Sequence, residues 1–217
     1  MYLRTSLAAA AALAVASAAS ATVVSFDDLQ LGTPNGTNQS KSYTDSGVTV
    51  NITTPDGSMN HIGSGQFAGL WIGENVSALG TYTFDFGPGN GATMFEFEFD
   101  AASAGGGSPP ERLFDFTQVG GTPTVSVGGV ADMTVNGAGS LATLELIATL
   151  DDGQATITIT SPTPMTSISF THEQNPSNNG LVIERLLMDV TAVPEPAGLA
   201  ALAPLAIGLL ARRRRPR

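Results

Sequence analysis

The stretch TYTFDFGPGNGATMFEFEFD, residues 81–100, decides the fold. In both of its halves aromatic residues alternate with threonine or acidic residues. Successive side chains of a strand point to opposite faces, so this period of two predicts two strands, each with one apolar face. The link Gly87-Pro88-Gly89-Asn90-Gly91 is a turn sequence and predicts a β-hairpin. We expect the apolar face to carry Tyr82, Phe84, Phe86, Phe95, Phe97 and Phe99, and the polar face Glu96, Glu98 and Asp100.

The same alternation continues on both sides of the hairpin, and helical periodicity is scarce. The further predicted strands are residues 22–28, 48–53, 68–73, 113–118, 122–127, 142–150, 155–160, 168–170 and 181–192. Sheets that are apolar on one face need a second sheet to cover them. We therefore predict an all-β domain over residues 22–192, a two-sheet antiparallel β-sandwich of jelly-roll type, flanked by an N-terminal signal helix and a C-terminal hydrophobic helix. The stretch AASAGGGSPP, residues 101–110, is the expected flexible loop within it.

The charge distribution narrows the choice of partners. The chain has 217 residues, with nine Lys and Arg against nineteen Asp and Glu. Between residues 22 and 192 only Lys41, Arg112 and Arg185 are basic against eighteen acids, a formal charge of −15. Such a body lacks the basic surface that binds nucleic acid or anionic lipid. Cysteine is absent, which excludes disulfides, thiolate metal sites and thiol nucleophiles.

The N-terminal segment, residues 1–21, has the pattern of a secretory signal peptide. Arg4 precedes an apolar run, and Ala19-Ser20-Ala21 provides the small residues that signal peptidase accepts. We predict cleavage after Ala21. The alternative, a buried N-terminal helix, is disfavoured because the run has no polar face.

The C-terminal segment, residues 193–217, has three parts. Pro194, Glu195 and Pro196 form an extended motif, and residues 197–211 form an uncharged apolar stretch. As a helix this stretch would span about 22 Å, against about 30 Å for a hydrocarbon core. It therefore suits transient membrane insertion better than permanent anchoring. The basic tail consists of Arg212, Arg213, Arg214, Arg215 and Arg217.

This tripartite segment resembles the PEP-CTERM sorting signal of Gram-negative bacteria. The resemblance covers about the last twenty-five residues, and Pro204 and the short apolar stretch depart from the pattern. It implies processing near Pro194–Pro196 by an exosortase, and delivery to the cell surface or the exopolysaccharide matrix. The alternative is an ordinary C-terminal membrane anchor. Residues 25–29 and 181–190 also look like the opening and closing strands of uncharacterised jelly-roll domains carried by such proteins, and this likeness bears on the fold alone.

The sequence contains no complete catalytic motif, and we predict a protein that is not an enzyme. His61-Ile62-Gly63-Ser64-Gly65 lacks the first glycine of a nucleophile elbow, and His172-Glu173 is expected in a polar turn. Glu96 and Glu98 share a strand face, but we expect that face to be solvated. A divergent hydrolase with a carboxylate pair remains the remote alternative.

Two binding hypotheses remain open. Asp27, Asp28, Glu184 and Asp189 would meet if the first and last strands paired, and their oxygen ligands suit a structural calcium ion. Trp71 has apolar flanks, so we expect it in the core, but exposure of its ring would favour a carbohydrate-binding module, with or without calcium. The favoured hypothesis is a non-catalytic, exported β-sandwich associated with extracellular polysaccharide.

Overall fold

The computed structural model describes most of the predicted domain. The described residues are 22–27, 39–62, 69–73, 79–87, 89–101, 111–148, 153–174 and 180–192. All of them belong to one compact unit, Ala21–Val193. The predicted signal peptide and sorting segment lie outside the described residues, as does nearly all of the predicted loop at 101–110. Within the described ranges, no helix is long and apolar enough to cross a bilayer.

The described residues form β-strands and one short 3₁₀ helix. The elements are β1 (Thr22–Asp27), β2 (Ser40–Asp45), β3 (Val48–Thr53), β4 (Ser58–Ile62), β5 (Gly69–Gly73), β6 (Leu79–Asp85), β7 (Asn90–Ala101), β8 (Arg112–Gly120), β9 (Thr124–Ala131), β10 (Met133–Asn136), η1 (Leu141–Thr143), β11 (Glu145–Ala148), β12 (Gln154–Glu173) and β13 (Leu181–Ala192). Every strand pairing among them is antiparallel. The prediction of an all-β, antiparallel fold is therefore confirmed.

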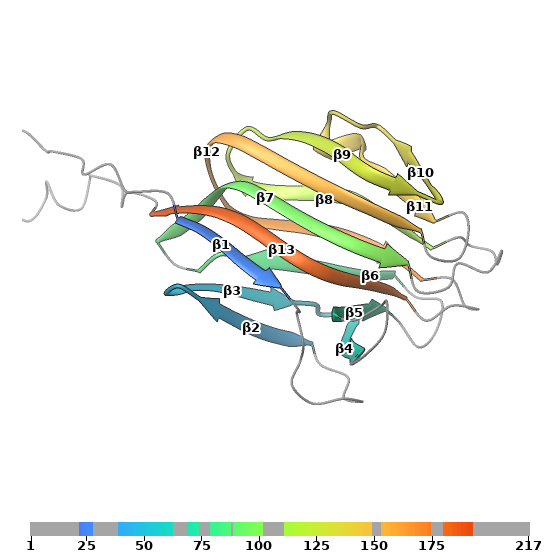
Figure 1. Ribbon diagram of the computed structural model, residues 1–217, viewed down its shortest axis with the longest axis horizontal. Helices are drawn as coiled ribbons and strands as arrows, with labels where there is room; N and C mark the ends of the chain where they lie inside the picture. Colours follow the sequence, from blue (N-terminus) through green and yellow to red (C-terminus); the bar gives the residue numbers. More distant parts are fainter. Residues whose placement is uncertain are drawn as a thin grey trace, which may run out of the picture. The chain divides into compact units, whose positions relative to one another are not determined.

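The strands form two layers that share β12. The first half of β12 pairs with β7 and β9, and its second half pairs with β6 and β8. The first layer runs β9-β12-β7-β13, with β1 and β5 along the far side of β13 and β4 beyond β5. The second layer runs β10-β11-β8-β12-β6-β3-β2. Figure 1 shows the first layer in front and β12 turning back into the second. The sandwich is thus one continuous sheet folded over.

The sheet folds over at a proline-containing bend inside β12. Pro162 and Pro164 have no backbone N–H to donate, so ladder pairing is interrupted there. The hydroxyl of Ser161 accepts a hydrogen bond from the Thr122 backbone N–H (2.9 Å) and donates one to the Thr163 carbonyl (2.6 Å). The sequence predicted two separate strands on either side of these prolines. The structure joins them into one bent strand.

The turn between β8 and β9 bends at the same place. Gly121 has φ +70°, and a Cβ there would lie 2.7 Å from both Met165 Cγ and Ser161 Oγ. Since real Cβ atoms do not approach so closely, only glycine fits this corner. The β6–β7 turn also lies near the bend of β12. Asp85 of β6 pairs with Ser167 of β12, and Ala92 of β7 pairs with Met165 of β12.

The core between the layers is built from the predicted aromatic faces. The ring of Phe97 in β7 lies 5.6 Å from that of Phe170 in β12 and 6.5 Å from the rings of Phe84 in β6 and Phe116 in β8. The aromatic residues predicted to face inwards are all buried. Burying each of these rings stabilises the fold by about 1.5–3 kcal/mol, so this cluster contributes strongly to holding the two layers together.

Candidate functional site

A small hollow lies on the outward face of the first layer, over β7, β9, β12 and β13. Its volume is about 170 Å³. Alternation along β7 directs Phe97 and Phe99 into the core, so Glu98 and Asp100 belong to the outward face. A register shift in β13 between Ile183 and Arg185 brings Glu184 to the same hollow. The lining residues are Glu98, Phe99, Asp100, Gly129, Gln154, Ala155, Thr156 and Glu184.

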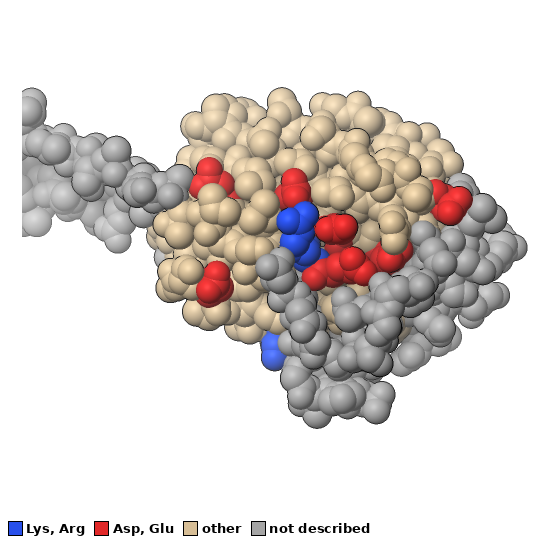
Figure 2. Space-filling view, viewed as in Figure 1, with Lys and Arg blue, Asp and Glu red and all other residues tan. Residues whose placement is uncertain are grey.

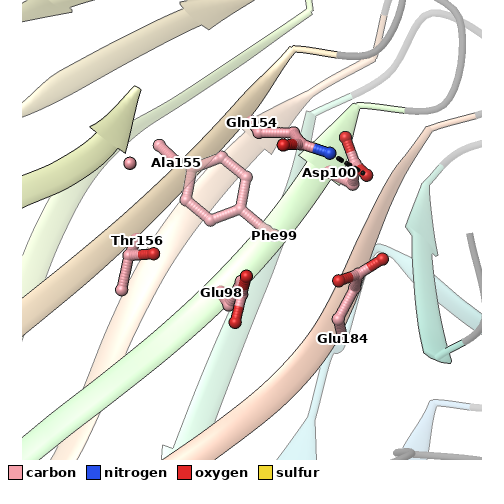
Figure 3. A pocket seen from close by; sticks show the side chains of 8 residues that line it. Glu98, Phe99, Asp100, Gln154, Ala155, Thr156 and Glu184 are labelled. Atoms are coloured by element: carbon pink, nitrogen blue, oxygen red, sulfur yellow. Dashed lines mark hydrogen bonds between the residues drawn. The ribbon is translucent and has the colours of Figure 1, made fainter. Parts of the chain in front are cut away.

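Three carboxyl groups gather at this hollow, as Figure 3 shows. Asp100 is only 2% exposed and accepts a hydrogen bond from the Gln154 side-chain amide at 2.9 Å. Burial raises the pKa of Glu184, and the negative charges of Asp100 and Glu98 raise it further. The hollow is therefore polar and negatively charged, and it offers mainly hydrogen-bond acceptors.

A single guanidinium holds the acids beside the hollow. Arg185 of β13 forms ion pairs with Glu96 (3.2 Å) and Glu98 (3.4 Å) of β7, and Thr158 of β12 donates a hydrogen bond to Glu96 (2.9 Å). Figure 2 shows this face, with basic atoms surrounded by acidic ones. Ion pairs this exposed contribute about 0.2–1 kcal/mol each. Glu96 and Glu98 lie on the outward face, where the alternation predicted them.

Trp71 lies on the outward face of β5, outside the core cluster. Its neighbours Leu70 and Ile72 are fully buried in the core, whereas Trp71 is partly exposed. A Cβ on Gly73 would lie 2.6 Å from indole Cζ2, and a Cβ on Gly180 would lie 2.7 Å from indole Nε1. The indole thus lies along the sheet, over two glycines. The expectation of a core position, drawn from the apolar flanks, is corrected, because alternation places the flanking residues on the other face.

Two of the four acids predicted to hold calcium, Glu184 and Asp189, lie far apart on β13. The first and last strands do pair, with Thr22 opposite Val190 and Asp27 opposite Arg185. However, Glu184 lines the hollow, whereas Asp189 lies opposite Val23, five residues further along β13, or about 16 Å at 3.3 Å per residue. Asp28 and the side chain of Asp27 lie outside what the structure describes.

In the part of the chain that the structure describes, no group of three or more histidine, aspartate or glutamate side chains is arranged to hold a metal ion.

His172 corrects another prediction. The sequence indicated a polar turn, but His172 is in β12 and is fully buried, with its Nε2 2.7 Å from Oε1 of the 1% exposed Glu111. Its position two residues after the core residue Phe170 is the signal that was missed, since both belong to the same strand face. Ser64 lies outside the described residues.

Comparison with known proteins does not identify the chain. No protein family and no curated protein matches it. One solved structure with some similarity is a loop-swap mutant of Xyn11A from Necallimastix patriciarum, at 10% sequence identity and a TM-score of 0.23. That match covers 80% of this chain and 98% of the other.

Proposed function

We propose that this protein is an exported, exosortase-sorted, non-catalytic β-sandwich that acts at the cell surface or in the exopolysaccharide matrix. One observation carries the proposal: the paired strands begin at Thr22 and end at Ala192, beside the predicted cleavage after Ala21 and the motif Pro194–Pro196. The core extends from Val24 to Val190. Removal of both predicted targeting segments would leave in place every strand and every core residue that the structure describes.

The arrangement of the first and last strands supports the same proposal. Thr22 pairs with Val190, so the two ends of the domain lie side by side on one layer. The −15 charge between residues 22 and 192 would keep the delivered protein hydrated and separate from like-charged copies.

The proposal that the protein is non-catalytic rests on the burial of its candidate acid–base side chains, which a substrate would have to reach. His172 and Glu111 form the buried acid–base pair, and their side chains are 0% and 1% exposed. Asp100 is nearly as buried and is held by Gln154. A catalytic group must reach within hydrogen-bond distance of its substrate, and the burial of these three side chains argues against such a role for them.

The experiment replaces Pro194, Glu195 and Pro196 with alanine in a host that has an exosortase. We expect the variant to stay in the inner membrane, and the unaltered protein to reach the surface with Thr22 as its first residue by intact mass. The control is an alanine substitution of Pro216, beyond the arginine run, which should be delivered normally. Unchanged delivery of the triple variant would show that the sorting proposal is wrong.

A carbohydrate-binding module is the second candidate, and the outward position of Trp71 favours it. Exposed aromatic rings beside polar groups provide the contacts that sugars use, an apolar face and hydrogen bonds. A glycan array probed with the mature domain, with and without chelator, tests this candidate separately from sorting. Binding that disappears with chelator would favour the calcium-dependent form.

A further inference from the structure

We propose that Asp189 binds the α-ammonium group that removal of the predicted signal peptide creates at Thr22. The proposal rests on the predicted cleavage after Ala21 and goes beyond sorting, since cleavage then adds a stabilising contact to the folded domain. It combines the register between β1 and β13 with two shielded polar atoms that have no hydrogen-bond partner among the described residues.

The two shielded atoms belong to Asp189 and Thr191, near the C-terminal end of β13. In the part of the chain that the structure describes, Asp189 Oδ1 and Thr191 Oγ1 are shielded from water and have no hydrogen-bond partner. The two residues flank Val190, which is buried in the core, so alternation assigns both to the outward face of the strand. Shielding a polar atom without giving it a partner costs free energy, so a donor placed here would stabilise the domain.

The register places the backbone nitrogen of Thr22 beside these atoms. Thr22 is opposite Val190 in the antiparallel pairing of β1 with β13. With strands about 4.8 Å apart and residues about 3.3 Å apart along a strand, the Cα of Thr22 is about 6 Å from those of Asp189 and Thr191. A positive charge on the Thr22 nitrogen would therefore be within the range of roughly 4–6 Å over which a carboxylate stabilises it.

Cleavage gives that nitrogen its charge. In the precursor it is the uncharged amide nitrogen of the peptide bond between Ala21 and Thr22. Hydrolysis breaks this bond, adding the OH of water to the Ala21 carbonyl carbon and the hydrogen to the Thr22 nitrogen. The amine takes up a proton at neutral pH, because its ordinary pKa is about 7.7–8.0. The ammonium has three N–H donors, enough for Asp189 Oδ1 and Thr191 Oγ1 together.

The surroundings of Asp189 supply no competing cation in the described part of the chain. The charged residues on its own strand and on the strands around it are Glu184, Arg185, Glu96, Glu98, Asp27, Lys41 and Asp45. Arg185 forms ion pairs with two of these acids, and the amino group of Lys41 lies over the ring of Tyr43. The residues directly opposite Asp189 are the uncharged Val23 and Met94. The new ammonium would supply the positive charge that this end of the face lacks.

The test blocks the ammonium chemically in the processed protein purified from its host. Lys41 is the only lysine, so in a Lys41→Arg background the α-amino group is the only primary amine, and acetic anhydride neutralises it. Intact mass establishes the first residue before treatment and the single acetyl group after it. Thr22 is exposed, so we expect a modest effect at pH 6.5, a melting temperature lowered by about 2–4 °C.

The pH dependence distinguishes an ion pair from a general effect of acetylation. A carboxylate raises the pKa of the ammonium in the folded state. Stability from the pair is therefore complete below about pH 7.7 and is lost as the pH rises through the raised pKa. The difference between acetylated and free protein should vanish by about pH 10. The rate of acetylation against pH measures the same pKa in the Lys41→Arg protein, and a value of about 8 or below would overturn the proposal.

Variants locate the partner of the ammonium. Asp189→Asn should abolish the effect of acetylation. Asp115→Asn is the matched control, since it makes the same change on β8, which pairs with neither β1 nor β13, and it should leave the effect intact. An undiminished effect in Asp189→Asn would overturn the proposal and leave sorting untouched. A first residue other than Thr22 would overturn it together with the predicted cleavage site, which the sorting experiment at Pro194–Pro196 does not test.

Discussion

His172 Nε2 lies 2.7 Å from Glu111 Oε1, and both side chains are almost completely shielded from water. The pair links the C-terminal end of β12 to the residue that precedes β8. In the described part of the chain, His172 Nδ1 has no hydrogen-bond partner. Burying these polar groups away from water costs free energy. The contact between His172 and Glu111 offsets part of that cost for both side chains.

Removing one member of this pair should destabilise the domain strongly. We expect Glu111→Ala to lower the free energy of unfolding by about 1–3 kcal/mol, because it leaves a buried imidazole without its partner. Glu145→Ala, which removes a partly exposed partner of Arg112, should lower it by less than about 1 kcal/mol. Urea denaturation measures both. A double variant, Glu111→Leu with His172→Phe, should recover much of the loss, and equal effects of the two single variants would contradict the assignment.

The corner between β8 and β9 should tolerate no side chain. Gly121→Ala would bring a Cβ within 2.7 Å of Met165 and Ser161 at φ +70°, so we expect a loss of about 2–3 kcal/mol. Gly128→Ala is the matched control in β9, where the new Cβ would meet nothing within 4 Å. Its effect should stay within about 0.5 kcal/mol. Thermal melting distinguishes the two, and a harmless Gly121→Ala would show that the bend does not require glycine.

Glu184 should make the domain less stable as the pH rises. Burial beside Asp100 and Glu98 raises its folded-state pKa above the ordinary value of 4.5, so the folded state binds more protons than the unfolded state in that range. Stability from this group is complete below about pH 4.5 and is lost as the pH rises through the raised pKa. Glu184→Gln should therefore flatten the fall in urea midpoint between pH 4 and pH 7. A profile parallel to that of the unaltered domain would contradict this account.

Calcium should leave the stability of the domain unchanged. A ligand that binds the folded state alone raises the melting temperature in proportion to the logarithm of its concentration, and the described residues bring no set of three suitable side chains together. We expect the same melting temperature with millimolar calcium and with chelator. A rise of several degrees with calcium would restore the hypothesis that involved Asp27, Asp28, Glu184 and Asp189.

The parts of the fold that follow strict alternation could be predicted from the sequence. In the hairpin of β6 and β7, a period of two fixes which face each residue occupies, and the burial of Phe84 and Phe97 follows it. β2 was not predicted, because SKSYTD has only Tyr43 as an apolar residue and lies at the edge of the second layer. Edge strands are specified by their neighbour more than by their own pattern.

The candidate site could be predicted only in part. From the sequence, Glu98 and Asp100 could be placed on one strand face, and Trp71 could be identified as the only tryptophan. Their relative position depends on strand order, since β5 and β7 lie on opposite sides of β13. Pairing between distant segments is not encoded in local periodicity. The buried position of His172 was missed because its polar character outweighed its place in the alternation.

The pairing of Thr22 with Val190 also fixes where the two ends of the domain lie relative to Trp71. Trp71 pairs with Val182 near the other end of β13, ten residues before Ala192, or about 33 Å at 3.3 Å per residue. If the proposed mature protein is attached through its last residues, both ends of the domain lie at one end of β13 and the outward face of β5 lies at the other.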